Sequence, residues 1–289
     1  MFTLFTDTDT DLTPIEAKHY GYKLISMPYI IDEKEIKPYE DFVEFDYKAF
    51  YDQLRGGVLP KTCALSPMAY KAYFEDELAK GNDILYVHFS KNMSGTFNAM
   101  QIAIDELKEL YPERTVYTID TKGITILSNI IVKEVGDLYL AGKTVEEILD
   151  WAKENVDHYA TYFFADTLKF FALSGRISNF SGLFGNLIGI KPIIYMDDNG
   201  QMTNIGKVKG KKNAFNKLIE YFDELALDIY NRRIVIGHSD ALELAQSFGD
   251  MLKEKYGSNL NIEYVVVNPT AGSHCGPETI GIAFYAKHK

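Results

Sequence analysis

The sequence predicts an α/β protein of two domains, an N-terminal Rossmann-like parallel sheet and a C-terminal mixed or antiparallel sheet with helices. From Asn82 to Trp151, apolar strand-like runs alternate with stretches of helical periodicity, which is typical of a parallel sheet covered by helices. The residues Asp197 to Gly200 (Asp-Asp-Asn-Gly) join two β-prone runs and indicate a hairpin, which belongs to an antiparallel sheet. A chain of 289 residues is long enough for two ordinary domains, so we divide it into 1–155 and 156–289.

The composition is that of a soluble globular protein, with 46% hydrophobic and 25% charged residues. No run approaches the roughly 18 to 20 apolar residues that span a bilayer, and the first residues lack a basic leader, so we expect a cytoplasmic protein without stable membrane insertion. The net charge of −11 without a strong basic block argues against nucleic acid as a partner. Cys63 and Cys275 are the two cysteines, which makes a disulfide framework or a thiolate metal site an unfavourable interpretation.

The first strand-like run, over residues 2–6, ends in alternating aspartates at Asp7, Asp9 and Asp11. A calcium loop needs a glycine at its sixth position, where this run has Leu12. We therefore expect turn and capping roles, with a site-facing role for Asp7 as the alternative. The other predicted elements of this half are a helix from Pro14, a β-rich stretch over 22–31, helices over 47–54, 68–80, 97–110, 124–140 and 144–158, and strands over 84–89 and 115–119.

The residues Ser94, Gly95 and Thr96 follow the strand at 84–89 and stand where the helix at 97–110 begins. Unpaired backbone N–H groups and the positive end of the helix dipole converge at such a position and favour an anion. The simpler interpretation is that Ser94 only caps the helix. The residues alone leave both interpretations open.

Two more stretches have a structural and a functional interpretation. Thr62 lies in a polar loop between Pro60 and Pro67, where hydroxyls commonly bond nearby backbone. The segment from Ile177 to Ile190 carries no charge and alternates apolar with small polar residues. It suits either a core helix or the wall of an apolar cavity.

The second half is predicted to contain strands over 159–165, 190–197, 201–208, 233–237, 262–267 and 280–286, with helices around 215–225 and 244–252. A loop over 268–279 contains His274 and a high density of glycine, which suggests backbone held close to another group. One local basic cluster, Lys207, Lys209, Lys211 and Lys212, is either a solvated face or a docking surface for a partner.

Five motifs in order resemble those of the DegV family, and the resemblance runs from end to end of the chain. They are Thr6-Asp7 with Asp11-Leu12, Lys61-Thr-Cys-Ala-Leu-Ser-Pro67, Ser94-Gly95-Thr96, Asp166-Thr-Leu168 with Gly175-Arg-Ile-Ser178, and Gly272-Ser-His-Cys-Gly-Pro277. The DegV family consists of bacterial fatty-acid-binding proteins, some of them carrier subunits of fatty-acid kinase. Ser174 and Glu278 stand where the family often has glycine, and we expect Glu278 to face outward.

The resemblance implies a single long-chain fatty acid, similar to palmitate or oleate, in the cleft between two α/β domains. Its carboxylate would be held by Thr62 and Ser94. The resemblance extends the ligand-binding set to Gly95, Thr96 and His274. Four more residues are expected near the head group or at a surface where a partner docks: Arg176, Cys63, Cys275 and Asp7. No metal and no cofactor beyond the bound fatty acid are implied.

The predicted function is that of a non-enzymatic carrier, which presents its fatty acid to a partner kinase that forms the acyl phosphate. The alternative is a hydrolase or acyltransferase that uses Ser94, Cys63 or Cys275 with His274. Ser94 lacks the Gly-x-Ser-x-Gly elbow of many serine hydrolases. A sensor of small anions or nucleotides is a third class, for which the chain lacks the Gly-x-x-x-x-Gly-Lys phosphate loop.

Overall fold

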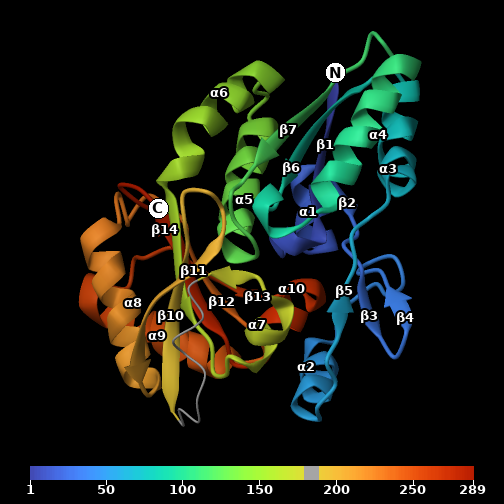
Figure 1. The fold of residues 1–289 in the computed structure, drawn as a ribbon. Helices are drawn as coiled ribbons and strands as arrows, with labels where there is room; N and C mark the ends of the chain where they lie inside the picture. Colours follow the sequence, from blue (N-terminus) through green and yellow to red (C-terminus); the bar gives the residue numbers. More distant parts are fainter. Residues whose placement is uncertain (179–188) are drawn as a thin grey trace.

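The computed structural model of the protein describes residues 1–178 and 189–289. The described chain forms a four-stranded parallel sheet, a seven-stranded mixed sheet and a three-stranded antiparallel sheet. Figure 1 shows the parallel sheet and the mixed sheet side by side, with the small sheet projecting beside the parallel one. The predicted fold class is confirmed, and the small third sheet is an addition that the sequence analysis did not foresee.

The parallel sheet has the strand order β2-β1-β6-β7. Its strands are β1 (Phe2–Asp7), β2 (Tyr22–Ile25), β6 (Asp83–His88) and β7 (Val116–Asp120), and its helices are α1 (Pro14–Tyr20), α3 (Pro67–Ala79), α4 (Thr96–Leu110) and α5 (Ile126–Leu140). In Figure 1, α3 and α4 lie on one side of this sheet and α5 lies on the other. The pairing of Thr6 with Val87, and of His88 with Asp120, brings the carboxyl ends of β1, β6 and β7 to one edge. Ligands of parallel sheets collect at such an edge.

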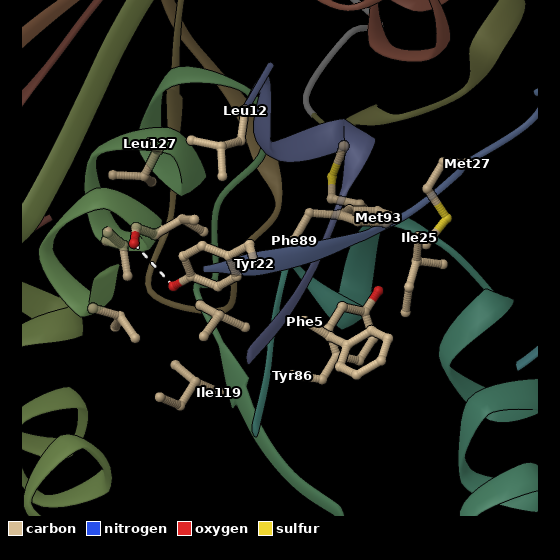
Figure 2. Close-up of a cluster of buried hydrophobic side chains, with 14 of the residues drawn as sticks. Phe5, Leu12, Tyr22, Ile25, Met27, Tyr86, Phe89, Met93, Ile119 and Leu127 are labelled. Atoms are coloured by element: carbon tan, nitrogen blue, oxygen red, sulfur yellow. Dashed lines mark hydrogen bonds between the residues drawn. The ribbon is translucent and has the colours of Figure 1, made fainter. Parts of the chain in front are cut away.

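The core of this half consists of aromatic and aliphatic side chains that pack between the sheet and its helices (Figure 2). Phe5, Tyr22 and Tyr86 are buried there, together with Leu127 of α5. The one hydroxyl that Figure 2 shows bonded, Oη of Tyr22, donates to the carbonyl oxygen of Val132 at 2.9 Å. The tyrosine is buried at low cost because its polar atom has a partner.

The mixed sheet has the order β13-β12-β14-β8-β10-β11-β9. Its strands are β8 (Tyr159–Phe164), β9 (Ile177–Ser178), β10 (Ile190–Met196), β11 (Met202–Lys209), β12 (Ile234–His238), β13 (Ile262–Val266) and β14 (Ile280–Tyr285), with helices α7 (Lys169–Ser174), α8 (Lys211–Leu225), α9 (Leu242–Tyr256) and α10 (Pro269–Cys275). The predicted hairpin is confirmed, since β10 and β11 are antiparallel and the N–H of Gly200 donates to the carbonyl of Asp197 at 2.8 Å. Residues 179–188 of the uncharged segment lie outside the described residues.

Helix α5 connects the two halves. It contacts α1 and the short 3-10 helix η1 (Thr8–Thr10) beside the parallel sheet, and also β8, β12 and β14 of the mixed sheet. The buried ammonium of its Lys133 pairs with Glu16 at 2.8 Å and with Glu263 at 2.7 Å, one carboxylate from each half. The helix α6 (Val145–Asn155) and the 3-10 helix η3 (Val156–His158) then lead into β8. Because α5 contacts both sheets, the contacts do not mark a domain boundary, and the division of the chain at residue 155 stays a prediction.

The third sheet holds three short strands, β3 (Tyr29–Ile31), β4 (Lys34–Ile36) and β5 (Lys61–Thr62), beside α2 (Tyr47–Arg55). Its β5 pairs with β3, with Thr62 opposite Tyr29. Tyr51 of α2 donates its hydroxyl to the carbonyl of Val267 at 3.0 Å, which ties this part to the end of β13. Thr62 is thus held on a strand rather than in the polar loop that the sequence predicts.

Candidate functional site

Thr62 and His274 meet at the centre of the site, with Oγ1 of Thr62 and Nε2 of His274 3.0 Å apart. His274 belongs to α10, where the sequence predicts a loop over 268–279, and that prediction was wrong for the helical part. Asn268 caps this helix by accepting a hydrogen bond from the N–H of Ala271 at 3.0 Å, and Pro269 stands at its first position. A short helix begins here because cap and proline outweigh the glycines.

The glycines of α10 allow close packing against aromatic rings. A Cβ on Gly272 would collide with Tyr51, and a Cβ on Gly276 would collide with Phe170. Gly276 also has a positive φ of 69°, which side chains disfavour. The prediction that glycine marks backbone held close to another group is confirmed, and the groups that the structure describes there are protein side chains.

His274 is neutral at physiological pH. Burial and, to a smaller extent, the nearby Arg176 guanidinium together lower the pKa of His274 to about 4. A neutral imidazole has one N–H and one lone pair. With the proton on Nε2, His274 donates to Oγ1 of Thr62 and leaves the threonine hydroxyl proton free for another acceptor.

Thr62 and His274 line a polar cavity of about 580 Å³ between the two halves of the chain. Its wall consists of Asp9, Met27, Thr62, Cys63, Ala64, Phe89, Met93, Ser94, Gly95, Ile124, Arg176, Thr270 and His274. The structure therefore brings together six predicted ligand or neighbouring residues from four separate parts of the sequence. Gly95 and Ser94 of the helix start lie in the same wall.

The start of α4 matches the predicted strand, loop and helix, with one correction. Gly95 is the cap residue, and Oγ of Ser94 accepts the N–H of Thr96 at 3.2 Å, which leaves the Ser94 hydroxyl proton available to an acceptor in the cavity. Thr96 itself is buried behind this wall, where its Oγ1 accepts from the N–H of Leu65 at 3.1 Å and contacts Oη of Tyr70 at 3.1 Å. The geometry argues against the predicted contact of Thr96 with a ligand, because its hydroxyl has inward partners.

An apolar cavity of about 610 Å³ adjoins the polar one. Its wall consists of Met93, Ile124, Thr125, Ile126, Thr161, Phe163, Phe171, Met196, Met202, Gly237, Val267, Ala271, His274, Cys275, Thr279 and Gly281. Met93, Ile124 and His274 line both cavities. Each volume lies within the roughly 300–1,000 Å³ of small-molecule sites.

Two of the three hydroxyls in the apolar wall have partners within the protein. Oγ1 of Thr161 donates to the carbonyl of Ile282 at 3.0 Å, and Oγ1 of Thr279 donates to the carbonyl of Cys275 at 3.2 Å. Burial raises the pKa of the Cys275 thiol to about 12, so the sulfur is a protonated, apolar group. This wall is therefore suited to a hydrocarbon.

A groove of about 900 Å³ lies on another side of the same residues. It is lined by Leu59, Pro60, Lys61, Thr62, Phe170, Leu173, Ser174, Arg176, Ser273 and His274. Thr62, Arg176 and His274 line both this groove and the polar cavity. Arg176 is exposed and donates to the carbonyl of Ser174, so its guanidinium stands at the boundary between the two spaces.

The remaining predicted residues have structural partners. Burial and the neighbouring Glu35 carboxylate together raise the pKa of the Cys63 thiol to about 11. Asp7 is fully buried behind the cavity, where its Oδ2 accepts from Oη of Tyr86 at 3.0 Å and from the N–H of Phe89 at 3.2 Å. Glu278 lines neither cavity and pairs with Lys211, as expected for an outward residue.

Asp9, not Asp7, is the aspartate that lines the cavity, and the sequence analysis gave it only a turn role. The signal that was available is its place in the turn that follows the first predicted strand. The carboxyl end of that strand meets the ends of its parallel neighbours, which include the strand before Ser94.

A protein-family model described as "Uncharacterised protein, DegV family" matches residues 1–287. The chain belongs to the DegV family. A DegV domain-containing protein of Clostridium perfringens is 32% identical over 291 residues, which cover 100% of this chain and 98% of the relative. The resemblance on which the sequence analysis relied is confirmed.

Solved DegV structures have the same fold. The chain matches a fatty-acid-binding DegV family protein of Thermus thermophilus with a TM-score of 0.87 and 21% identity, covering 99% of each chain. It matches a DegV family protein of Eubacterium eligens, loaded with heptadecanoic acid, with a TM-score of 0.85 and 22% identity, covering 99% of this chain and 100% of the other. Within the described part of this DegV chain, no helix is long and apolar enough to cross a membrane, and no three His, Cys, Asp or Glu side chains gather as metal ligands would.

Proposed function

We propose that this DegV protein binds a single long-chain fatty acid, similar to palmitate or oleate, with its carboxylate held by Thr62 and Ser94. The observation that carries the proposal is the junction of the two cavities. A space with hydroxyl donors adjoins a space lined by apolar atoms, and Met93, Ile124 and His274 belong to both walls. A fatty acid has the same division into a polar head and an apolar tail.

The carboxylate of the ligand would accept two hydrogen bonds from hydroxyl groups. Thr62 can donate its hydroxyl hydrogen when its oxygen accepts from Nε2–H of His274. Ser94 can donate its hydroxyl hydrogen while its oxygen accepts from the N–H of Thr96. Bonds to a charged acceptor contribute about 1.5–3 kcal/mol each. Gly95 adds room, since a Cβ there would meet nothing within 4 Å.

The tail would supply most of the affinity. Burial yields about 0.8 kcal/mol per methylene, or on the order of 11 kcal/mol for a chain of sixteen carbons before association costs are subtracted. Met93, Met196 and Met202 in the apolar wall are flexible and adapt to the shape of a chain. The fatty acid bound by the Eubacterium eligens relative supports this class of ligand.

We further propose a carrier role in the cytoplasm, in which a partner fatty-acid kinase phosphorylates the bound carboxylate for phospholipid metabolism. The groove beside Thr62, Arg176 and His274 supports this, because it adjoins the head-group cavity from another side. The protein itself would be no enzyme and need no cofactor or metal. Two observations disfavour the hydrolase alternative: His274 is bonded to Thr62, and burial keeps both thiols protonated.

Organic extraction of the purified protein, followed by mass spectrometry, tests the binding. We expect a fatty acid at close to one equivalent, and rebinding of palmitate or oleate by the stripped protein in calorimetry. A protein that releases no fatty acid and binds neither compound would contradict the proposal. Transfer of phosphate to the bound acid by a purified fatty-acid kinase tests the carrier role separately.

A further inference from the structure

Asp9 differs from the two aspartates beside it because it lines the polar cavity; Oδ2 of Asp11 is also buried without a hydrogen-bond partner among the described residues, but Asp11 lines neither cavity. Oδ1 of Asp7 accepts the N–H of Asp9 at 3.0 Å, and Oδ1 of Asp11 accepts the N–H and the side-chain amide of Asn268 at 2.8 Å and 2.7 Å. Asp9 is 5% exposed, it lines the polar cavity, and its Oδ1 is buried without a hydrogen-bond partner among the described residues. A buried polar atom in a cavity wall without a protein partner points to a partner in the cavity.

The surroundings of Asp9 favour its neutral form. Asp7 and Asp11 flank it on the same turn, and no ion pair joins it to a cation of the described chain. Burial raises the pKa of Asp9 well above its ordinary range, and the charges of Asp7 and Asp11 raise it further. A neutral carboxyl carries an O–H group and is a hydrogen-bond donor.

We propose that Asp9 is a third head-group contact, a neutral carboxyl whose O–H donates to the carboxylate of the bound ligand. This assignment rests on the proposed function. A carboxylate would thus be bound by a third donor without a nearby buried cation, and an ionised Asp9 would repel it. The site would prefer a fatty acid over the fatty alcohol of equal length, because the bond to a charged acceptor is the stronger one.

The test compares oleate with oleyl alcohol on the whole protein, by competition against a fluorescent fatty acid. The variants are Asp9→Leu, which removes the donor, and Asp9→Asn, which keeps an N–H. The matched control is Asp120→Asn, at the carboxyl end of the neighbouring strand β7 and outside both cavity walls. We expect Asp9→Leu to weaken oleate binding tenfold or more while changing alcohol binding less than threefold, and Asp9→Asn and the control to bind both like wild type.

A pH series decides the matter if Asp9→Leu fails to fold. The groups that face Asp9 are Asp7 and Asp11 on its own turn, Asn268 from α10, and Cys63, Arg176 and His274 across the cavity. These groups are present in both wild type and Asp9→Asn, so the two proteins differ only in the side chain at position 9. As the pH rises, wild type should lose tenfold more oleate affinity than Asp9→Asn does, because only wild type can lose a proton at this position.

Three results would overturn the assignment. Oleate binding by Asp9→Leu equal to wild type would remove Asp9 from the site. An equal loss for acid and alcohol would make its role structural. Identical pH profiles for wild type and Asp9→Asn would show that no proton on Asp9 contributes. If wild type binds neither compound, the proposed function fails and this assignment fails with it, whereas the first three results leave fatty-acid binding intact.

Discussion

Thr62 and His274 are separated by 212 positions in sequence, and their side chains lie within hydrogen-bond distance at 3.0 Å. The threonine is on a two-residue strand of the small sheet, and the histidine is on α10 after the mixed sheet. Because burial holds the pKa of His274 to about 4, the pair is a neutral hydrogen-bonded unit rather than an ion pair. Its chemistry is that of a hydroxyl oriented by an imidazole.

Replacing Thr62 by valine should weaken fatty-acid binding by tenfold or more. The variant keeps the branched shape and removes the hydroxyl, so one charged hydrogen bond of about 1.5–3 kcal/mol is lost. Calorimetry with palmitate measures the change. Thr118→Val, at an exposed position of β7, is the control and should bind like wild type. Unchanged affinity in Thr62→Val would exclude the hydroxyl from the head-group site.

Ser94→Ala and Ser66→Ala separate ligand binding from helix capping. Oγ of Ser94 accepts the N–H of Thr96 at 3.2 Å, and Oγ of Ser66 accepts the N–H of Ala69 at 3.2 Å. Loss of either bond should lower the free energy of unfolding by about 0.5–2 kcal/mol, measured in urea. Only Ser94→Ala should also lose tenfold or more in affinity for palmitate. Equal binding by the two variants would leave Ser94 with a cap role alone.

Ala271→Leu should reduce the binding of octadecanoate by tenfold or more, because the larger side chain fills part of the apolar cavity. Overpacking a buried helix also costs about 1–3 kcal/mol of stability. Ala245→Leu in α9 is the matched control, a buried helical alanine outside the cavity walls. It should lose stability and keep its affinity. If both variants bind alike once folded, the tail does not occupy this cavity.

Asp11→Asn should stabilise the protein relative to wild type as the pH rises. Burial raises the pKa of Asp11 to about 7, above its value of about 4 in the unfolded chain. The stability that this carboxyl contributes is complete below pH 4 and is lost as the pH rises toward 7. Asparagine does not titrate and still accepts from Asn268 through its oxygen. The difference in unfolding free energy should therefore grow by up to about 1.4 kcal/mol per pH unit in this window.

Urea unfolding at pH 4, 5, 6 and 7 measures this difference. Asp150→Asn, at an exposed position of α6, is the control and should follow wild type at every pH. A constant difference between Asp11→Asn and wild type would contradict the raised pKa.

Most elements of the fold were predictable because their signals are local. The Asp197 to Gly200 turn and the apolar periodicity of the helix at 97–110 each determine one element, and both are confirmed. The small sheet was not predictable in this way. Its strands β3 and β5 are three and two residues long, and they exist as strands only because distant segments pair.

The site was predictable where side-chain chemistry is visible in a motif. Thr62, Ser94 and His274, chosen largely through the resemblance to the DegV family, line the same cavity, and their contact with a ligand stays a prediction. The inward partners of Thr96, the N–H of Leu65 and the hydroxyl of Tyr70, could not be predicted from the sequence of a helix start. Asp9 was missed because its environment depends on burial, which no spacing encodes.

The exposed turn at Gly142, between α5 and α6, lies in sequence between two groups of residues that line the polar cavity. A cut there would leave Thr62 and Ser94 on one polypeptide and Arg176 and His274 on the other. Neither polypeptide alone would hold a fatty acid by both its head and its tail. If the proposed function holds, a bound fatty acid would contact both fragments and stabilise their association. The concentration of free fatty acid would then set the fraction of cleaved protein that stays assembled.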